Sequence, residues 1–245
     1  IAEGLLPPGV NIMKMKGVFT RKYDEQGTLE RHKFRLVGCG YSQVEGLDYF
    51  ETHAGTVCMV VVRIMMAAIA AMNLHTRLFD IGTAFLEGEL QEEIYVRLPS
   101  YLGGGIWRLF KALYGLKQAG HIFVKLLNGF LRALGFKQSK TEPQLFTLIT
   151  KLEGDELKKA DLPSRWNGYG YCIVSTYVDD IPAAANSPFL LDWIEDELKH
   201  RFKKVTCKDL RWFIGHQISI TPGRVEISQG QYVMQLIKRF EYELN

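Results

Sequence analysis

Two adjacent carboxylates follow an apolar run in the second half of the chain. Residues 171–178 read Tyr-Cys-Ile-Val-Ser-Thr-Tyr-Val, a strand-like run that leads directly into Asp179 and Asp180. Two acids at a hairpin tip repel each other, and a bound divalent cation would remove that repulsion. The competing interpretation is a solvated turn, because aspartate is common in turns.

A third carboxylate, Asp80, lies near the end of the short apolar run 78–81. An aspartate alone at this place would usually be a cap. Three carboxylates on neighbouring strand ends, however, form the oxygen-rich site that Mg²⁺ prefers. Two such ions about 4 Å apart can activate an attacking hydroxyl and stabilise a leaving oxygen in phosphoryl transfer. The acids therefore predict a metal-dependent phosphoryl-transfer site, which a polymerase and a nuclease would share.

The elements expected around these acids mix hairpins with helices, which is an α+β pattern. Paired strands are predicted at 18–23 with 31–37 and at 94–98 with 107–110. Helices are predicted at 59–74 and 116–134, after the sequence Asn186-Ser187-Pro188, and after Ser228. These elements would place the acids on strands packed against helices.

Three local segments predict further details of the fold. The helix at 59–74 is apolar almost all round, which predicts burial. Segment 150–170 is rich in charge, glycine and proline, and is expected to be a long hairpin loop. Pro182 cannot donate a hydrogen bond to a neighbouring strand, so a short or irregular strand is expected after Asp180.

Bulk composition excludes several classes of protein. The chain has 245 residues, 47% of them hydrophobic, and a formal charge of +3, which fits one sizeable core or a few subdomains. The four cysteines form no C-x-x-C pair, so a zinc ribbon or disulfide framework is not indicated and a reducing compartment fits best. No P-loop, serine-hydrolase or H-x-x-x-H zinc motif occurs. The opening at Ile1 shows no targeting segment and favours a fragment of a longer protein.

Several short blocks keep one order along nearly the whole chain. They are Arg31-His-Lys-Phe-Arg-Leu-Val, Asp80-Ile-Gly-Thr-Ala-Phe-Leu-Glu-Gly, Lys111-Ala-Leu-Tyr-Gly-Leu-Lys-Gln-Ala, Tyr177-Val-Asp-Asp and Asp209-Leu-Arg-Trp-Phe-Ile-Gly. In this order they resemble the reverse transcriptase domain of copia-type LTR retrotransposons (Pseudoviridae). Each block is weak alone, but their joint order is specific.

The resemblance implies a right-hand polymerase fold, with fingers and palm built from antiparallel sheet and packed helices, and the start of a thumb. Its implied divisions are 1–78 as fingers including the buried helix, 79–220 as palm with an interleaved fingers segment, and 221–245 as palm end and start of thumb. Asp80, Asp179 and Asp180 become the palm carboxylates. They would hold two Mg²⁺ ions, with Mn²⁺ as an alternative, beside the carbonyl of Ile81.

The resemblance also assigns two residues to the incoming nucleotide. Phe85 falls five residues after Asp80, where an aromatic ring would lie beneath the sugar and exclude a 2′-hydroxyl; the alternative is a core phenylalanine. Gln118 matches a position that contacts the nucleotide near its sugar and base. Its alternative is an exposed helix glutamine.

Charged and hairpin residues complete the implied site. Lys22, Lys33 and Arg35 lie on the first hairpin, where fingers residues would contact the triphosphate through charge-assisted hydrogen bonds. Phe213 and Gly215 match the primer grip, where glycine would suit a close approach of the backbone to the primer. An ordinary hairpin and solvated surface charges are the alternatives.

The predicted function is an RNA-directed DNA polymerase that extends a primer with dNTPs. Expected partners are a primed RNA or DNA template, the ribonuclease H and integrase regions of the parent polyprotein, and a second copy in a dimer, without a membrane. The expected location is a virus-like particle in the cytoplasm, or the nucleus, and not the secretory route. Departures from the family pattern at Gly38-Cys39, Ala54-Gly55 and Gly120-His121 favour the alternative, a domesticated or decayed polymerase-fold module that binds nucleic acid or serves assembly without catalysis. A metal-dependent nuclease is a third reading.

Overall fold

The computed structural model describes residues 1–23 and 28–243, without the side chains of residues 3, 22, 23 and 241–243. The chain folds as two compact units. The first combines residues 1–55 with 83–129, and the second combines 56–82 with 130–245. The chain first enters the second unit after residue 55, returns after residue 82, and enters it again within α2 (Ala119–Ala133).

The first unit is built on a four-stranded sheet with the order β2-β1-β4-β5. Its strands are β1 (Ile12–Tyr23), β2 (Leu29–Gly38), β4 (Glu89–Arg97) and β5 (Ile106–Lys111). Both predicted hairpins are confirmed, since β1 pairs with β2 and β4 with β5 in antiparallel register. Alternating side chains bury Met13, Met15, Ile94 and Val96 in one core, as expected for a sheet with one apolar face.

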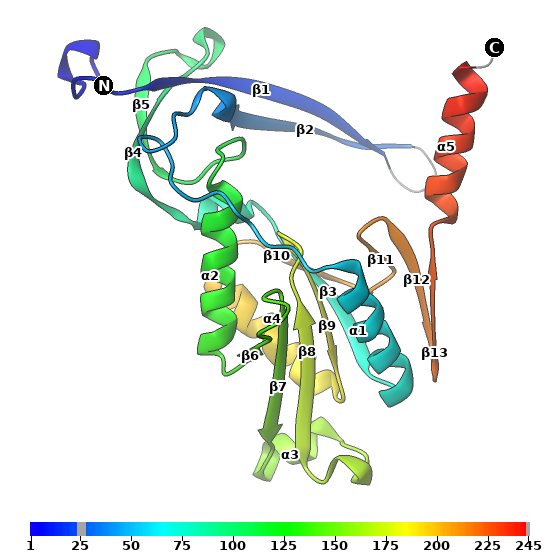
Figure 1. Cartoon of the computed structure of the whole chain (residues 1–245). Coiled ribbons are helices and arrows are strands. Elements are labelled where there is room, and N and C mark those ends of the chain that lie inside the picture. Colours follow the sequence, from blue (N-terminus) through cyan, green and yellow to red (C-terminus); the bar gives the residue numbers. More distant parts are fainter. Residues whose placement is uncertain (24–27, 244–245) are drawn as a thin grey trace. The chain divides into compact units, whose positions relative to one another are not determined.

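The second unit is built on a six-stranded sheet with the order β10-β3-β9-β8-β7-β6 (Figure 1). Its strands are β3 (His75–Ile81), β6 (Lys137–Gln138), β7 (Leu145–Lys151), β8 (Tyr169–Ser175), β9 (Asp180–Ala185) and β10 (Val205–Lys208). Helix α4 (Pro188–Arg201) lies against β3 and β9. The other face packs against α1 (Met59–Met72) and a small sheet of β11 (Trp212–Phe213), β12 (His216–Thr221) and β13 (Arg224–Ser228).

Helix α4 starts as predicted. The Ser187 hydroxyl accepts a hydrogen bond from the Phe189 N–H at 3.2 Å and donates one to the Ala160 carbonyl at 2.7 Å, and Pro188 follows at the first helical position. An N-cap serine of this kind contributes about 1 kcal/mol to helix stability. Leu191, Ile194 and Leu198 are fully buried on the face that packs on the sheet, so the helix is fixed both at its start and along its length.

The prediction that the helix at 59–74 is buried all round is wrong. One side of α1 is buried in the core of the second unit, but Val60 and Ile64 on the opposite side are 64% and 59% exposed. The apolar composition hides the boundary between the two faces, because alanine and methionine are as compatible with one face as with the other. In the described chain no helix is long and apolar enough to cross a membrane.

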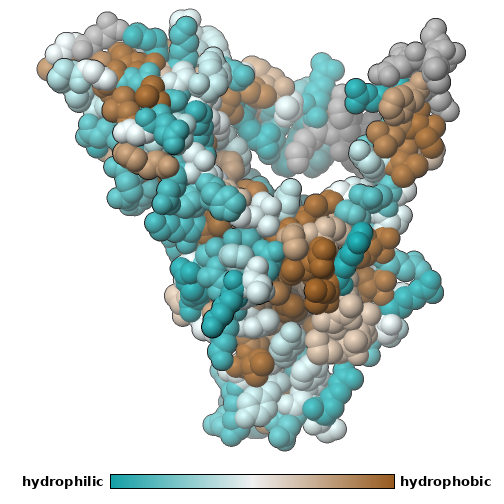
Figure 2. All heavy atoms as spheres, viewed as in Figure 1, coloured by the Kyte–Doolittle hydropathy of each residue, from teal (hydrophilic) through white to brown (hydrophobic). Residues whose placement is uncertain are grey.

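The last helix, α5 (Gly230–Glu243), begins close to the predicted Ser228, whose hydroxyl accepts the Gly230 N–H at 3.1 Å. Hydrophobic residues gather along it on the surface (Figure 2), and Val233, Ile237 and Phe240 are all exposed. The described side chains of this helix are not among those that form the core of the second unit.

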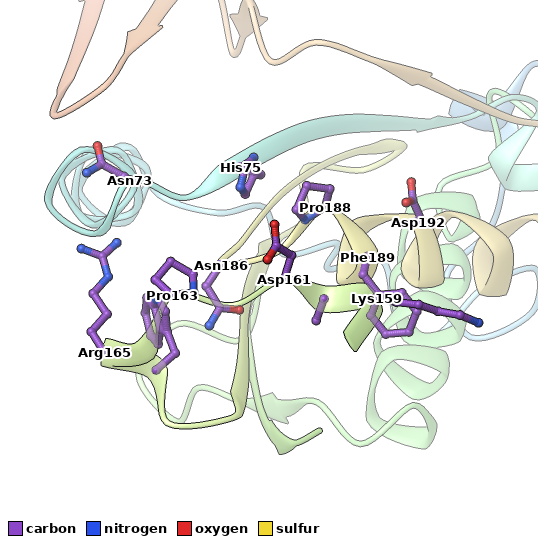
Figure 3. Close-up of a pocket in the computed structure, with 12 residues that line it drawn as sticks. Asn73, His75, Lys159, Asp161, Pro163, Arg165, Asn186, Pro188, Phe189 and Asp192 are labelled. Atoms are coloured by element: carbon purple, nitrogen blue, oxygen red, sulfur yellow. The ribbon is translucent and has the colours of Figure 1, made fainter. Parts of the chain in front are cut away.

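The segment predicted to be a loop at 150–170 contains regular structure instead. It forms α3 (Gly154–Ala160) and a 3₁₀ turn at Ser164–Trp166, between β7 and β8. The charged residues and glycines of this segment favoured the loop prediction, because the helix is short and largely exposed. Together with the first residue of β3 and the start of α4, the segment lines a pocket of about 600 Å³, in which Asp161, Arg165 and His75 are labelled in Figure 3.

Pro182 does not disrupt β9, contrary to the expectation. The strand pairs with β3 over its whole length, with Leu78 opposite Pro182. Its pairing with β8 covers only Ala183 to Ala185, the residues that follow the proline. The missing N–H therefore falls outside the β8 ladder, and the strand stays regular.

Candidate active site

Backbone register brings two of the three predicted carboxylates together on one face of the six-stranded sheet. Asp80 on β3 lies directly opposite Asp180 on β9, and Thr206 on β10 lies opposite Asp80 on its other side. Residues directly opposite each other project to the same face of a sheet. The three side chains therefore form a row across β10, β3 and β9.

The third carboxylate, Asp179, lies in the tight turn between β8 and β9. Tyr177 and Asp180 exchange two backbone hydrogen bonds of 2.9 and 3.1 Å, which leaves only Val178 and Asp179 in the turn. The Ile81 N–H donates to the Asp179 carbonyl at 3.0 Å, so the turn is bound to the end of the Asp80 strand. This bond places Ile81, which follows Asp80 in the chain, next to the backbone of Asp179.

The turn has a strained backbone. Val178 has a φ of 57°, in the left-handed region that β-branched residues rarely adopt. Positive φ at the first central residue alone is the pattern of a type II′ hairpin turn, where glycine is preferred. A valine held there indicates that the surrounding contacts fix the turn, which is common at functional sites.

The charges of the three acids act on one another. Partial burial, followed by the charges of Asp179 and Asp80, raises the pKa of Asp180 to about 6, and the nearby Lys208 ammonium opposes this shift. A carboxyl group with a raised pKa is destabilised in its ionised form. The site therefore favours the arrival of positive charge near neutral pH.

The chemistry of this donor set fits Mg²⁺. Carboxylate oxygens are its preferred protein ligands, and a divalent cation would relieve the repulsion that, after burial, raises the pKa of Asp180. Within residues 1–23 and 28–243, no three His, Cys, Asp or Glu side chains converge closely enough to enclose a metal ion. The carboxylates are thus near enough to interact electrostatically but do not surround a single point.

The predicted primer-grip residues form a second tight turn, joining β11 to β12. Phe213 pairs with His216, and both residues between them have positive φ, 46° at Ile214 and 71° at Gly215. This is the pattern of a type I′ turn. Phe213 is 2% exposed, and its ring contacts the Tyr177 ring edge-on with centroids 6.2 Å apart. The second turn is therefore packed directly against the residue that begins the acidic turn.

Phe85, the predicted sugar gate, lies in the first unit in a 3₁₀ turn at Ala84–Glu87. Its ring packs against Tyr114, with centroids 4.7 Å apart, and more loosely against Phe123 at 6.5 Å. The side chain is half-buried at the border of the core. It thus packs against the core while remaining partly exposed.

Gln118 is not the exposed helix glutamine that was the alternative to a nucleotide contact. It is 1% exposed and precedes α2. Its side chain donates to the Asp48 carbonyl at 2.8 Å and accepts from the Gln43 amide at 3.0 Å. Gln43 also accepts from the Lys117 N–H at 2.7 Å. Gln118 therefore ties segment 43–48 to the start of α2 within the first unit.

The basic residues predicted to contact the triphosphate share one face of the first hairpin. Register places Arg35 opposite Val18, Lys33 opposite Thr20 and Arg31 opposite Lys22. The guanidinium of Arg35 lies over the Tyr114 ring at 5.5 Å. The side chain of Lys22 lies outside the described residues. The hairpin thus presents a row of cationic positions on a single face.

Sequence reasoning missed β10, because none of the predicted strands includes its residues. Thr206 donates from its hydroxyl to Asp80 Oδ1 at 3.3 Å, and Lys208 lies close enough to lower the pKa of Asp180. A four-residue edge strand, Val-Thr-Cys-Lys, has too little alternation to stand out. The available signal was the β-branched pair Val205-Thr206 after the end of α4.

Comparisons with known proteins agree with the sequence resemblance. The family model described as reverse transcriptase (RNA-dependent DNA polymerase) matches residues 5–245. The retrovirus-related Pol polyprotein from transposon RE1 of Arabidopsis thaliana is 32% identical over 238 residues, which cover 95% of this chain and 15% of that protein. The corresponding polyprotein from transposon RE2 is 33% identical over 238 residues, with the same coverage of each chain.

A more distant relative, the retrovirus-related Pol polyprotein from transposon TNT 1-94 of Nicotiana tabacum, is 27% identical over 242 residues. These residues cover 96% of this chain and 17% of the tobacco protein. The chain therefore spans only about a sixth of the length of the relatives that it matches.

Proposed function

The chain belongs to the reverse transcriptase family, in its copia-type retrotransposon branch, and we propose that it extends a primer with dNTPs along an RNA template. The observation that carries this proposal is the row formed by Asp80 and Asp180 with Asp179 in the adjoining turn. In the reaction, the primer 3′-hydroxyl attacks the α-phosphorus of the dNTP, a new phosphodiester bond forms, and pyrophosphate leaves.

In this proposal Asp80 and Asp179 are the principal ligands of two Mg²⁺ ions, with the Ile81 carbonyl beside them. Bound metal would supply activation of the attacking hydroxyl and stabilisation of the leaving oxygen. Asp180 supports the site by adding negative charge. Its raised pKa is consistent with a carboxylate whose charge is balanced only when a cation binds.

The remaining predicted residues take roles in substrate positioning. Phe85 would lie beneath the sugar of the incoming nucleotide and would clash with a 2′-hydroxyl. Lys33 and Arg35, with Lys22, would contact the triphosphate from the cationic face of the first hairpin. Gln118 holds segment 43–48 in place, so that its effect on the nucleotide would be exerted through this buried network.

The second unit, with its carboxylate row, corresponds in this proposal to most of a palm, and the first unit to fingers. The Ile214-Gly215 turn would lie against the primer strand, where a glycine backbone allows close approach. The relatives are Pol polyproteins, and we propose that ribonuclease H and integrase regions of such a polyprotein act with this chain. A virus-like particle in the cytoplasm is the proposed location.

Nucleotide incorporation tests the proposal. Purified chain is given poly(rA) primed with oligo(dT), dTTP and Mg²⁺, and compared with an Asp179→Asn variant that has the same side-chain size. Incorporation by the unchanged chain alone is the expected result. If a folded chain binds the primed template without extending it, the non-catalytic binding module is favoured, and degradation of the template would favour the nuclease.

A further inference from the structure

The edge strand β10 carries a hydroxyl group directly beside the carboxylate row. The Thr206 hydroxyl donates to Asp80 Oδ1 at 3.3 Å, and Thr206 lies opposite Asp80 in the register of β10 with β3. This hydrogen bond occupies one carboxylate oxygen and leaves the second oxygen for another ligand. Thr206 therefore restricts the orientation of the Asp80 side chain from outside the acidic cluster.

The strand that carries Thr206 is fixed to the end of the Asp80 strand. The Gly82 N–H donates to the Lys204 carbonyl at 2.8 Å, two residues beyond Asp80 and two before Thr206. A Cβ at position 82 would lie 2.7 Å from Cδ of the flexible Lys204 side chain, which would have to move to make room for it. Pairing then continues through Val205 with Ile81 and Cys207 with Phe79. The position of the Thr206 hydroxyl relative to Asp80 is consequently set by backbone contacts on both sides.

We propose that Thr206 is a positioning residue for Asp80, which orients the carboxylate for a divalent cation. The inference rests on the proposed function in assigning Asp80 to the metal. Hydrogen bonds from neighbouring groups commonly fix the orientation of metal-ligating carboxylates, and their loss typically weakens metal affinity by about 10-fold to 100-fold. Because the bond is long and Thr206 is exposed, the effect belongs at the lower end of that range.

The test replaces Thr206 with valine, which keeps the branched shape and strand preference but removes the hydroxyl. Mn²⁺ binding to the whole chain is measured by electron paramagnetic resonance without nucleotide or nucleic acid. Thr206→Val is expected to weaken Mn²⁺ affinity about tenfold, and Thr206→Ser to restore it to within about threefold. Thr221→Val, the same substitution at an exposed position that ends strand β12, is the matched control and leaves affinity unchanged.

A double-mutant comparison separates orientation of Asp80 from general packing of the strand. In an Asp80→Asn background, Thr206→Val is expected to have no further effect on Mn²⁺ affinity, since both changes act through one group. In primer extension, Thr206→Val is expected to lower kcat about tenfold while the KM for dNTP changes by less than about twofold.

Three results would overturn the proposal: Mn²⁺ affinity unchanged in Thr206→Val, a serine variant as weak as the valine variant, or Mn²⁺ binding that does not depend on Asp80. The binding measurement does not require turnover. A chain that binds Mn²⁺ through Asp80 and Thr206 but never extends a primer would refute the proposed polymerase activity and leave the role of Thr206 standing.

Discussion

The second unit contains two tight turns of the same length that are built from different residues. Each joins two antiparallel strands through two residues, and each holds a β-branched residue at positive φ, Val178 at 57° and Ile214 at 46°. The turn at 213–216 follows with Gly215, which accepts positive φ without strain. The turn at 177–180 has no glycine and follows with Asp179.

Under the proposed function, this difference reflects a turn at 177–180 that is held for chemistry and a turn at 213–216 that relieves part of its strain through Gly215. A glycine in place of Val178 would relieve the backbone but would also loosen the segment that presents Asp179 and Asp180. Strain that persists beside a group of repelling carboxylates is typical of a site where geometry matters more than stability. The contact between the Tyr177 and Phe213 rings joins the two turns, so a substitution in one turn is expected to affect the other.

Phe213→Ala should cause the largest loss of stability. The side chain is buried in the core of the second unit and supports Tyr177, and truncating a buried phenylalanine typically costs about 3–5 kcal/mol. Urea denaturation measures the change. Trp212→Ala, next to it but exposed, is the control and should cost far less.

Gly215→Ala should have the next largest effect. The added Cβ meets nothing within 4 Å, so only the positive φ of 71° opposes it, and the left-handed region costs an L-residue about 1–2 kcal/mol. Gly223→Ala, at φ 73° in another open hairpin turn, should show a similar loss. Equal stability of the Gly215 variant and the unchanged chain would contradict the type I′ assignment.

Asp180→Asn should stabilise the metal-free chain in a pH-dependent way. The pKa of Asp180 is about 6 in the folded chain against 3.8 ordinarily, so its favourable contribution is present below pH 4 and is lost as the pH rises through 6. With a chelator present, the variant should melt about 2–4 °C higher than the unchanged chain at pH 8, and at the same temperature at pH 4. A difference that is independent of pH would refute the raised pKa of Asp180.

Val178→Gly should have the smallest effect on stability and an opposite effect on activity. Relief of the positive φ, worth about 1–2 kcal/mol, outweighs the greater chain entropy of glycine, about 0.5–1 kcal/mol, so a small net stabilisation is expected. Primer extension should nevertheless slow, because the acidic turn is less firmly held. A variant that is both less stable and equally active would contradict the claim that Val178 is strained and holds the acidic turn in place.

The sequence was informative where local chemistry dictates structure. The hairpins, the Ser187-Pro188 start of α4 and the acids at strand ends follow from turn residues, caps and alternation, and the structure confirms their elements. The family itself was recognisable because short motifs keep one order along the chain.

Features decided by distant contacts were not predictable from local patterns. The buried network of Gln118 depends on residues about 70 positions earlier in the chain, and the exposed side of α1 depends on which neighbours happen to cover it. Thr206 gains its relation to Asp80 only through pairing between strands 126 residues apart. The helix α3 was missed because a short polar helix and a polar loop have the same composition.

The most direct test separates binding from chemistry at the acidic turn. Affinity for a primed RNA template and addition of a single dNTP are measured together, on the unchanged chain and on Asp179→Asn, with Mg²⁺. The account predicts similar affinities for the two chains and extension by the unchanged chain alone. Extension that survives in Asp179→Asn, or binding without extension by both chains, would contradict it.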